Sequence, residues 1–359
     1  MWKIISNPVR ASLVASLLVA CSAAAPEPSA SPSAGTPQPV SPPATGATTT
    51  SAEPSVAPPP QQAEPSAPQI EQRELGAVEH SLDKPVISLA LGQPRVAALV
   101  SEGDEITPWL FENGKWRAIA IPERLNVTAS DLKTARIYFG RDDKPRIMGA
   151  RQVEGQVRQL YLRYRGGEWK VEKAEIARLA NDPPAAMWGL LGHADPEVVC
   201  KQGDQCIIKR LTGWKTMDAG QKTPRVDLSG KEAFALYDDS VAILDGLAWR
   251  EIAKVEAPRG MWGNAQEFWI SSAAEAPQLL HGSAGKLDAF PSPVSVPGGI
   301  WGSGPSDVWL AGAEGLAHYA GDAWVRVAGV TGPLSEVFGR EGEVWGAGES
   351  GAWLVKPGS

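Results

Sequence analysis

The sequence is poor in cysteine, and this scarcity limits the metal chemistry open to the chain. Three cysteines stand among 359 residues, Cys21, Cys200 and Cys206. A structural zinc site needs four ligands, and no second cysteine pair accompanies the last two. The glycine-rich GSGPS at 302–306 lacks the lysine and the following helix of a phosphate loop. We therefore expect no metal and no cofactor.

Helical periodicity and an excess of basic residues are also missing. The longest helical candidate, VEKAEIARLAND at 171–182, is short and runs into Pro183 and Pro184. The chain has 34 basic and 41 acidic residues and a formal net charge of −7. Mild acidity of this size favours solubility and argues against nucleic acid as a partner.

An apolar run long enough to span a bilayer is absent as well, but a shorter one stands at the N-terminus. Lys3 and Arg10 precede an apolar run at 11–20. A membrane-spanning helix needs about 20 apolar residues, whereas the apolar core of a secretory signal has roughly 7 to 15. Residues 1–20 are therefore predicted to be a signal peptide.

The end of this run, LVAC at 18–21, resembles the lipobox of bacterial lipoproteins. The resemblance implies that Cys21 is diacylated, becomes the new N-terminus and gains a further acyl chain, so that the protein is anchored to a membrane. Because Ser22 rather than Asp follows the cysteine, it also implies export to the outer membrane of a bacterial cell envelope. An ordinary cleaved signal with a chance cysteine is the alternative.

Residues 21–72 form a compositionally distinct segment. From 22 to 72 the chain is mostly Ala, Pro, Ser, Thr and Gln, with no aromatic residue, no Leu, no Lys and no Arg. Such a segment cannot bury enough apolar surface to offset the entropy of ordering. We expect a disordered, proline-stiffened tether between the anchor and a folded domain at 73–359.

The two remaining cysteines flank a turn-like pentapeptide in VVCKQGDQCII, at 198–208. Two runs rich in β-branched residues surround the turn, so Cys200 and Cys206 are expected to face each other across a β-hairpin. An exported protein meets an oxidising compartment, which makes a disulfide between them plausible.

Two markers recur along the folded part. An aromatic or apolar residue followed by glycine ends a short apolar run at 91–92, 139–140, 188–189, 262–263, 301–302 and 338–339, with a weaker Ser229-Gly230. The second marker is a turn followed by tryptophan, and it occurs at Trp116, Trp169, Trp214, Trp249 and Trp324. In the fifth unit, Leu287 takes the place of the tryptophan. Recurrence of this kind predicts packing roles for most of the tryptophans.

The spacing of these markers suits repeated units of four antiparallel strands that are arranged radially. Within 299–327, one strand is expected to end at Trp301, and three further strands are expected to cover 307–311, 315–319 and 324–327. The pattern predicts an all-β fold, a seven-bladed β-propeller of four-stranded antiparallel blades. The seventh unit has residues for only three strands, and an open blade would expose an edge. A segment within 73–86 is therefore expected to supply its outer strand.

Three stretches carry a resemblance to a known group. GIWGSGPSDVWLAGAEGLAHYAGDAWVRV at 299–327, MWGNAQEFWI at 261–270 and EVWGAGESGAW at 343–353 resemble the Trp/Gly-rich repeats of bacterial surface lipoproteins related to the BNR or Asp-box propellers. That group includes sialidases and the photosystem II stability/assembly factor. Of the Asp-box pattern Ser-x-Asp-x-Gly-x-Thr-Trp, only Gly-x-x-Trp is present, at 166–169, 246–249 and 321–324. The resemblance implies the fold and does not carry over the activity.

The second unit departs from the repeat through its charge. Residues 133–173 hold 11 basic and 5 acidic residues. In QLYLRYR, strand alternation places Tyr161, Arg163 and Arg165 on one face. With Arg158 they form a candidate patch for an anionic glycan or an acidic protein surface, because Arg and Tyr are enriched at recognition sites. A solvated charged face is the other interpretation.

Other polar groups favour structural roles. The acidic pairs at 142–143 and 238–239 stand beside turn-prone residues, where Asp is favoured for its backbone properties. His281 and His318 fall at corresponding places in adjacent repeats, which favours a shared packing or turn role over a metal site. No catalytic residue is identified.

These observations lead to two function classes. The favoured one is a monomeric, lipid-anchored propeller that binds an envelope protein or an anionic polysaccharide without catalysis. The alternative is a glycan-cleaving hydrolase or lyase, sialidase-like, with a site at the channel mouth. Such an enzyme needs arginines from different blades around a carboxylate and a carboxylate pair about 5 to 10 Å apart.

Overall fold

The structure is a computed structural model, and it describes residues 70–358 except for 141, 155, 172–186, 189–196, 202–204, 211–212, 219–224, 230–231 and 341. For some strand residues, among them Arg158, Cys200 and Cys206, the backbone alone is described. The expected signal peptide, Cys21, the tether up to residue 69 and most of the helical candidate at 171–182 lie outside the described residues.

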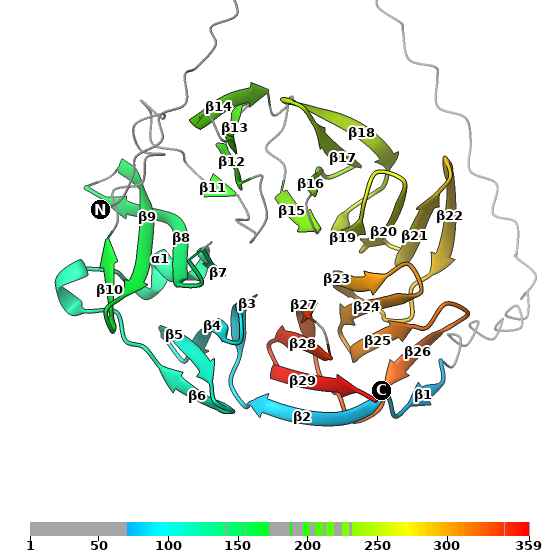
Figure 1. Cartoon of the computed structure of the whole chain (residues 1–359), viewed down its shortest axis with the longest axis horizontal. Helices are drawn as coiled ribbons and strands as arrows, with labels where there is room; N and C mark the ends of the chain where they lie inside the picture. The colour runs from blue at the N-terminus through cyan, green and yellow to red at the C-terminus, as the bar shows by residue number, and fades with distance from the viewer. Residues whose placement is uncertain are drawn as a thin grey trace, which may run out of the picture. The chain divides into compact units, whose positions relative to one another are not determined.

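The described residues form seven sheets, here numbered in the order of their first strands (Figure 1). Sheet 1 contains β3 (Val86–Leu91), β4 (Val96–Glu102), β5 (Glu105–Glu112) and β6 (Lys115–Ala118). Sheet 2 contains β7 (Arg136–Phe139), β8 (Pro145–Val153), β9 (Gln156–Arg165) and β10 (Glu168–Val171). Sheet 3 contains β11 (Met187–Trp188), β12 (Glu197–Lys201), β13 (Gln205–Arg210) and β14 (Gly213–Asp218).

The other four sheets repeat this order. Sheet 4 contains β15 (Arg225–Ser229), β16 (Glu232–Leu236), β17 (Ser240–Asp245) and β18 (Ala248–Lys254). Sheet 5 contains β19 (Pro258–Gly263), β20 (Glu267–Ser272), β21 (Gln278–Ser283) and β22 (Lys286–Pro291). Sheet 6 contains β23 (Pro297–Gly304), β24 (Asp307–Gly312), β25 (Gly315–Tyr319), β26 (Trp324–Val327) and the added β1 (Gln72–Arg73). Sheet 7 contains β27 (Leu334–Arg340), β28 (Glu343–Gly348), β29 (Gly351–Pro357) and β2 (Gly76–Leu82).

The two sequence markers fall where the strand pattern predicts them. The aromatic or apolar residue of the first marker lies at or near the end of the first strand of its sheet, and the tryptophan of the second marker lies at the start of the fourth strand. In sheet 6, β24, β25 and β26 begin where expected, and β23 continues to Gly304, beyond the expected end at Trp301. Turns with glycine or asparagine at positive φ, such as Asn113 and Gly114, connect the outer strands.

The sheets close into a ring through their first strands. Contacts join β3 to β7, β15 to β19, β19 to β23, β23 to β27 and β27 back to β3, while sheet 3 contacts its neighbours through β11 and β12. Figure 1 shows these first strands nearest the common centre. The all-β propeller fold is therefore confirmed. Because sheets 3 and 4 are described only in part, the count of seven blades stays a prediction.

The outer strand of the last sheet comes from the start of the domain, as expected. β2 pairs antiparallel with β29, with Val78 opposite Val355 and His80 opposite Trp353. Just before it, β1 adds to β26 in parallel, with Gln72 opposite Arg326. One short segment thus ties sheet 6 to sheet 7 and leaves no open edge on β29.

Apolar side chains fill the spaces between sheets. Four tryptophans are less than 2% exposed, Trp169, Trp269, Trp309 and Trp345. One cluster joins sheets 1 and 2 through Leu99, Leu110 and Leu162. The packing role expected for the tryptophans holds for these four. Two short helical segments, η1 (Glu123–Leu125) and α1 (Ala129–Lys133), connect β6 to β7.

Candidate functional site

The predicted patch lies on β9, and its alternation is as expected. Leu160 and Leu162 are buried, and they face the apolar cluster shared with sheet 1. Tyr161 and Arg163 lie on the opposite face and are partly buried, while Arg165, at the end of the strand, is exposed. The side chain of Arg158 is outside the described residues.

The strand register extends this face into a row across sheet 2. Tyr138 on β7 is opposite Arg146 on β8, Arg146 is opposite Arg163 on β9, and Arg163 is opposite Lys170 on β10. Side chains directly opposite each other on one face are close neighbours. The row therefore places one phenol and three cations side by side.

The equivalent face of sheets 5 and 6, the one toward the following sheet, is aromatic. In sheet 5 its row runs Trp262, Trp269, His281, and in sheet 6 it runs Trp301, Trp309, His318. Sheet 2 thus carries arginines where these two sheets carry tryptophan and histidine. A charge at such a position is costly unless it is paired and hydrogen-bonded.

Asp142, in the turn between β7 and β8, pairs with two of these cations. Its carboxylate accepts a hydrogen bond from Nη2 of Arg146 at 3.0 Å and another from Arg163. Burial opposes ionisation of Asp142, but the hydrogen bonds from Arg163 and Arg146 outweigh it and lower the pKa of this carboxyl. The aspartate therefore holds both guanidinium groups against sheet 2.

Two tyrosines complete the cluster around Arg146. Nη1 of Arg146 donates to the hydroxyl of Tyr161 at 3.0 Å. Tyr138 is 4% exposed, and burial raises the pKa of its phenol well above the ordinary value. Gly140 makes room for the arginine, since a Cβ there would lie 2.3 Å from Cζ of Arg146. The face turns away from sheet 1, towards the side on which β8 contacts β11 of sheet 3.

The exposed rim of sheet 2 carries further charged groups. Glu168 accepts a hydrogen bond from Nη2 of Arg124 at 2.5 Å and pairs with Nζ of Lys170 at 3.1 Å. The hydrogen bonds from Arg124 and Lys170 lower the pKa of the Glu168 carboxyl. At this rim, Arg165 is exposed and has no ion-pair partner among the described residues.

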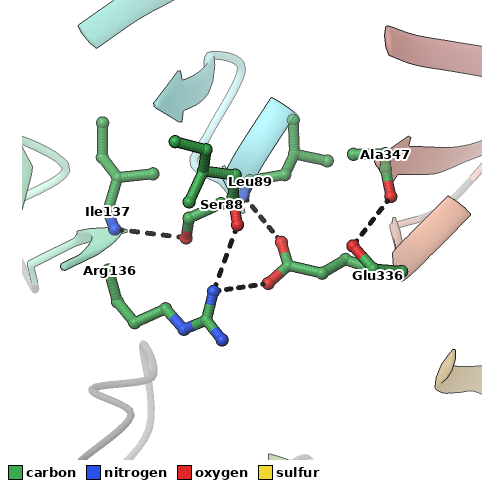
Figure 2. Close-up of polar contacts among 8 residues, drawn as sticks. Ser88, Leu89, Arg136, Ile137, Glu336 and Ala347 are labelled. Atoms are coloured by element: carbon green, nitrogen blue, oxygen red, sulfur yellow. Dashed lines mark hydrogen bonds and ion pairs between the residues drawn. The ribbon is translucent and has the colours of Figure 1, made fainter. Parts of the chain in front are cut away.

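A second polar cluster lies on the first strands of sheets 7, 1 and 2 (Figure 2). Oε2 of Glu336 accepts a hydrogen bond from the backbone N–H of Leu89 at 2.8 Å. Nη1 of Arg136 is 3.2 Å from Oε1 of Glu336 and donates to the carbonyl of Ile87 at 3.1 Å. The inner edge of β3 has no strand beside it, so these side chains satisfy its backbone groups.

Sequence reasoning missed this second cluster. Arg136 and Glu336 are 200 residues apart, and no local pattern links them. Their positions on first strands are the available signal, because first strands meet at the centre of the ring. Asp142 was considered only as part of an acidic pair, and its role as partner of Arg146 and Arg163 was also missed.

The other sequence candidates occupy structural positions. Cys200 on β12 is directly opposite Cys206 on β13 in an antiparallel hairpin, as expected, and the disulfide itself stays a prediction. Asp143 pairs with Arg95 at 2.6 Å and accepts a hydrogen bond from the backbone of Gln93. Asp238 lies in the turn between β16 and β17.

The two histidines repeat one arrangement in adjacent sheets, which confirms their correspondence. His281 stacks on Trp269 with ring centroids 4.3 Å apart, and His318 packs against Trp309 at the same distance. Each also approaches a carboxylate, Glu267 or Asp307. Among the described residues, no group of three or more His, Cys, Asp and Glu side chains is placed to hold a metal. Within that same part of the chain no helix has the length and apolar character to cross a membrane.

Comparisons with known proteins agree on the fold alone. No family model and no curated protein matches the sequence. A solved structure described as YCF48 bound to D1 peptide is 12% identical, with a TM-score of 0.56, and covers 81% of this chain and 100% of its own. A catalytically inactive virginiamycin B lyase from Staphylococcus aureus with quinupristin is 12% identical, with a TM-score of 0.54, and covers 80% and 98%. At these identities the likeness shows a β-propeller and no particular function.

Proposed function

We propose that this chain is a lipid-anchored β-propeller of the bacterial cell envelope that binds another envelope component, a protein or an anionic polysaccharide, without catalysing a reaction. The acyl chains on Cys21 hold it at the outer membrane, residues 21–72 serve as the tether, and the ring binds the partner as a monomer. The lipobox and the signal peptide support the anchor, and the propeller fold supports the binding role.

The observation that carries the binding role is the cationic face of sheet 2. Arg146, Arg163 and Lys170 stand in one row of sheet 2, and on the equivalent face the second and third strands of sheets 5 and 6 have a tryptophan and a histidine. Replacing core residues by charges costs stability, so a function offsets that cost. Arg165 extends this positive region to the exposed rim. An anionic surface is the partner that its charge complements.

The alternative, a glycan-cleaving hydrolase or lyase, needs a carboxylate pair at the channel mouth. On the first strands whose side chains are described, Glu336 is the carboxylate at the centre. It is engaged with the backbone of Leu89 and with Arg136. A carboxylate held in this way supports packing between sheets rather than acid–base catalysis, which favours the binding module.

The test is crosslinking and pull-down from intact envelopes, comparing the wild type with Cys21→Ala and with Arg165→Glu. The wild type is expected in the membrane fraction with its partner, and Cys21→Ala in the soluble fraction. Arg165→Glu should stay in the membrane and recover less partner, whereas Arg250→Glu, on the outer strand β18 of sheet 4, serves as the matched control. Membrane retention of Cys21→Ala contradicts the anchor, and equal recovery with Arg165→Glu contradicts the binding face.

A further inference from the structure

Arg136 uses only one side of its guanidinium group to hold the ring together. Nη1 donates to the carbonyl of Ile87 and to Glu336, and these are the hydrogen bonds that Arg136 makes among the described residues (Figure 2). Nε and Nη2 are left on the other edge. The side chain is 35% exposed, so this edge is open to solvent.

The free edge is the one that arginine uses to bind oxyanions side-on. Nε–H and one N–H of Nη2 point in nearly the same direction and match the two oxygens of a carboxylate. The bonds to Ile87 and Glu336 fix the orientation of the guanidinium plane beforehand. A ligand therefore orders little further side-chain freedom when it binds, which favours affinity.

The position of Arg136 in the repeat is also distinctive. It stands three residues before the marker residue Phe139, on the first strand of sheet 2. The equivalent residues in sheets 1, 5, 6 and 7 are Ser88, Arg259, Gly298 and Ser335. Arginine thus occurs twice at this central position, in sheets 2 and 5, and the three other residues are small. Arg259 and Ser335 are exposed.

We propose that the Nε–Nη2 edge of Arg136 is a carboxylate-binding subsite at the centre of the ring, and that its ligand is a uronate residue of an acidic polysaccharide. This inference rests on the proposed binding function and names its ligand class. Of the small residues at the equivalent positions, Ser335 is exposed and offers a hydroxyl that suits a sugar, whereas Ser88 is buried and its hydroxyl accepts a hydrogen bond from the N–H of Ile137. Arg259, on the first strand of sheet 5, supplies a second positive charge.

Glu336 lowers the affinity of this subsite for a carboxylate. Its carboxylate lies 3.2 Å from the guanidinium of Arg136 and is 17% exposed. A bound carboxylate therefore meets a fixed negative charge close to its own. Glu336→Gln removes that charge and keeps a carbonyl oxygen for the N–H of Leu89. This variant is expected to bind the ligand more tightly than the wild type.

The test is isothermal titration of the full chain with oligogalacturonate, and with the fully methyl-esterified oligomer as the uncharged control. We expect oligogalacturonate to bind, the ester to bind at least tenfold more weakly, and the affinity to fall with added salt. Arg136→Lys keeps the charge but loses the two-donor edge, so it should weaken binding about tenfold. Glu336→Gln should strengthen binding several-fold.

Arg124→Lys is the control, because Arg124 is an exposed arginine already paired with Glu168 away from the centre. It should bind as the wild type does, and the melting temperature of each variant checks its folding. Equal affinity of Arg136→Lys and wild type, or of ester and acid, overturns the subsite. If envelope pull-down recovers a partner while oligogalacturonate does not bind, or a peptide with a free C-terminal carboxylate binds in its place, the uronate inference fails and the proposed binding function stands.

Discussion

Asp307 and His318 lie on neighbouring strands of sheet 6, and Nε2 of His318 is 2.8 Å from Oδ1 of Asp307. The same oxygen accepts a hydrogen bond from Nε1 of Trp309 at 2.9 Å, and the other oxygen accepts one from Ser303. One carboxylate thus holds a buried tryptophan, a histidine and a turn. Glu267 precedes Trp269, and Glu343 precedes Trp345, with the same two-residue spacing.

The protein is expected to become less stable as the pH is lowered, because the carboxylate of Asp307 is then protonated. The hydrogen bond from His318 lowers the pKa of the Asp307 carboxyl. A depressed pKa contributes stability that is complete above about pH 5 and is lost below about pH 4, as the carboxylate is protonated. The free energy of unfolding of Asp307→Asn should be about 1 kcal/mol below the wild type at pH 7, because the group is partly exposed. The difference should be smaller at pH 3 than at pH 7, since protonation removes the interaction as the pH falls through the lowered pKa of this carboxyl.

Chemical denaturation at both pH values measures this difference. Asp288→Asn is a matched control, since Asp288 is 44% exposed, as Asp307 is, but pairs only with the exposed Lys286. It should change stability by a few tenths of a kcal/mol at most. A difference for Asp307→Asn that persists unchanged at pH 3 contradicts the role assigned to its charge.

Gly140→Ala should displace Arg146 and weaken the cationic face of sheet 2. The added Cβ would lie 2.3 Å from Cζ of the guanidinium, so the arginine must move and lose its bonds to Tyr161 and Asp142. We expect a loss of about 1–2 kcal/mol in the free energy of unfolding. Gly304→Ala is the control, because nothing lies within 4 Å of a Cβ at that position. Equal stability of the two variants would show that Arg146 adapts without cost.

Deletion of residues 73–86 should abolish cooperative unfolding of the ring. It removes β2, whose pairing with β29 completes sheet 7, and the backbone of β29 then loses its partner strand. The loss is expected to approach the whole stability of a domain, about 5–15 kcal/mol. Calorimetry compares the melting temperature of this deletion variant with that of a variant shortened within residues 30–60, in the expected tether. The shortened tether should leave the melting temperature unchanged, and an unchanged value for the first deletion rules the closure out.

Cys200 and Cys206 are expected to resist thiol labelling in the protein isolated from envelopes, until a reductant is added. Their Cα positions are directly opposed across the β12–β13 hairpin, a separation that a disulfide can span. Closing so short a loop contributes about 2 kcal/mol in the chain-entropy model. The double variant Cys200→Ser, Cys206→Ser should lose about that much, measured by denaturation under oxidising conditions. Rapid labelling without reductant shows that the pair is reduced.

Strands, turns and their order follow from local sequence, and these features were predictable. Leu162 and Arg163 lie on opposite faces of β9 because successive side chains of a strand point to opposite faces. This placement does not depend on the packing of the rest of the chain. The recurrence of tryptophan after a turn located the outer strands in the same way. Even ring closure could be expected, since the last unit lacks residues for a fourth strand.

The tertiary structure alone decided which charges meet. Asp142 reaches Arg146 and Arg163 because a turn and two strands of sheet 2 align in one register. Arg136 meets Glu336 because first strands from both ends of the domain converge at the centre. Such contacts depend on the packing of whole sheets, on which a side chain's neighbours in sequence have little influence. The sequence alone therefore specified the strands and their closure, and the packing of the ring placed the charges that a ligand would meet.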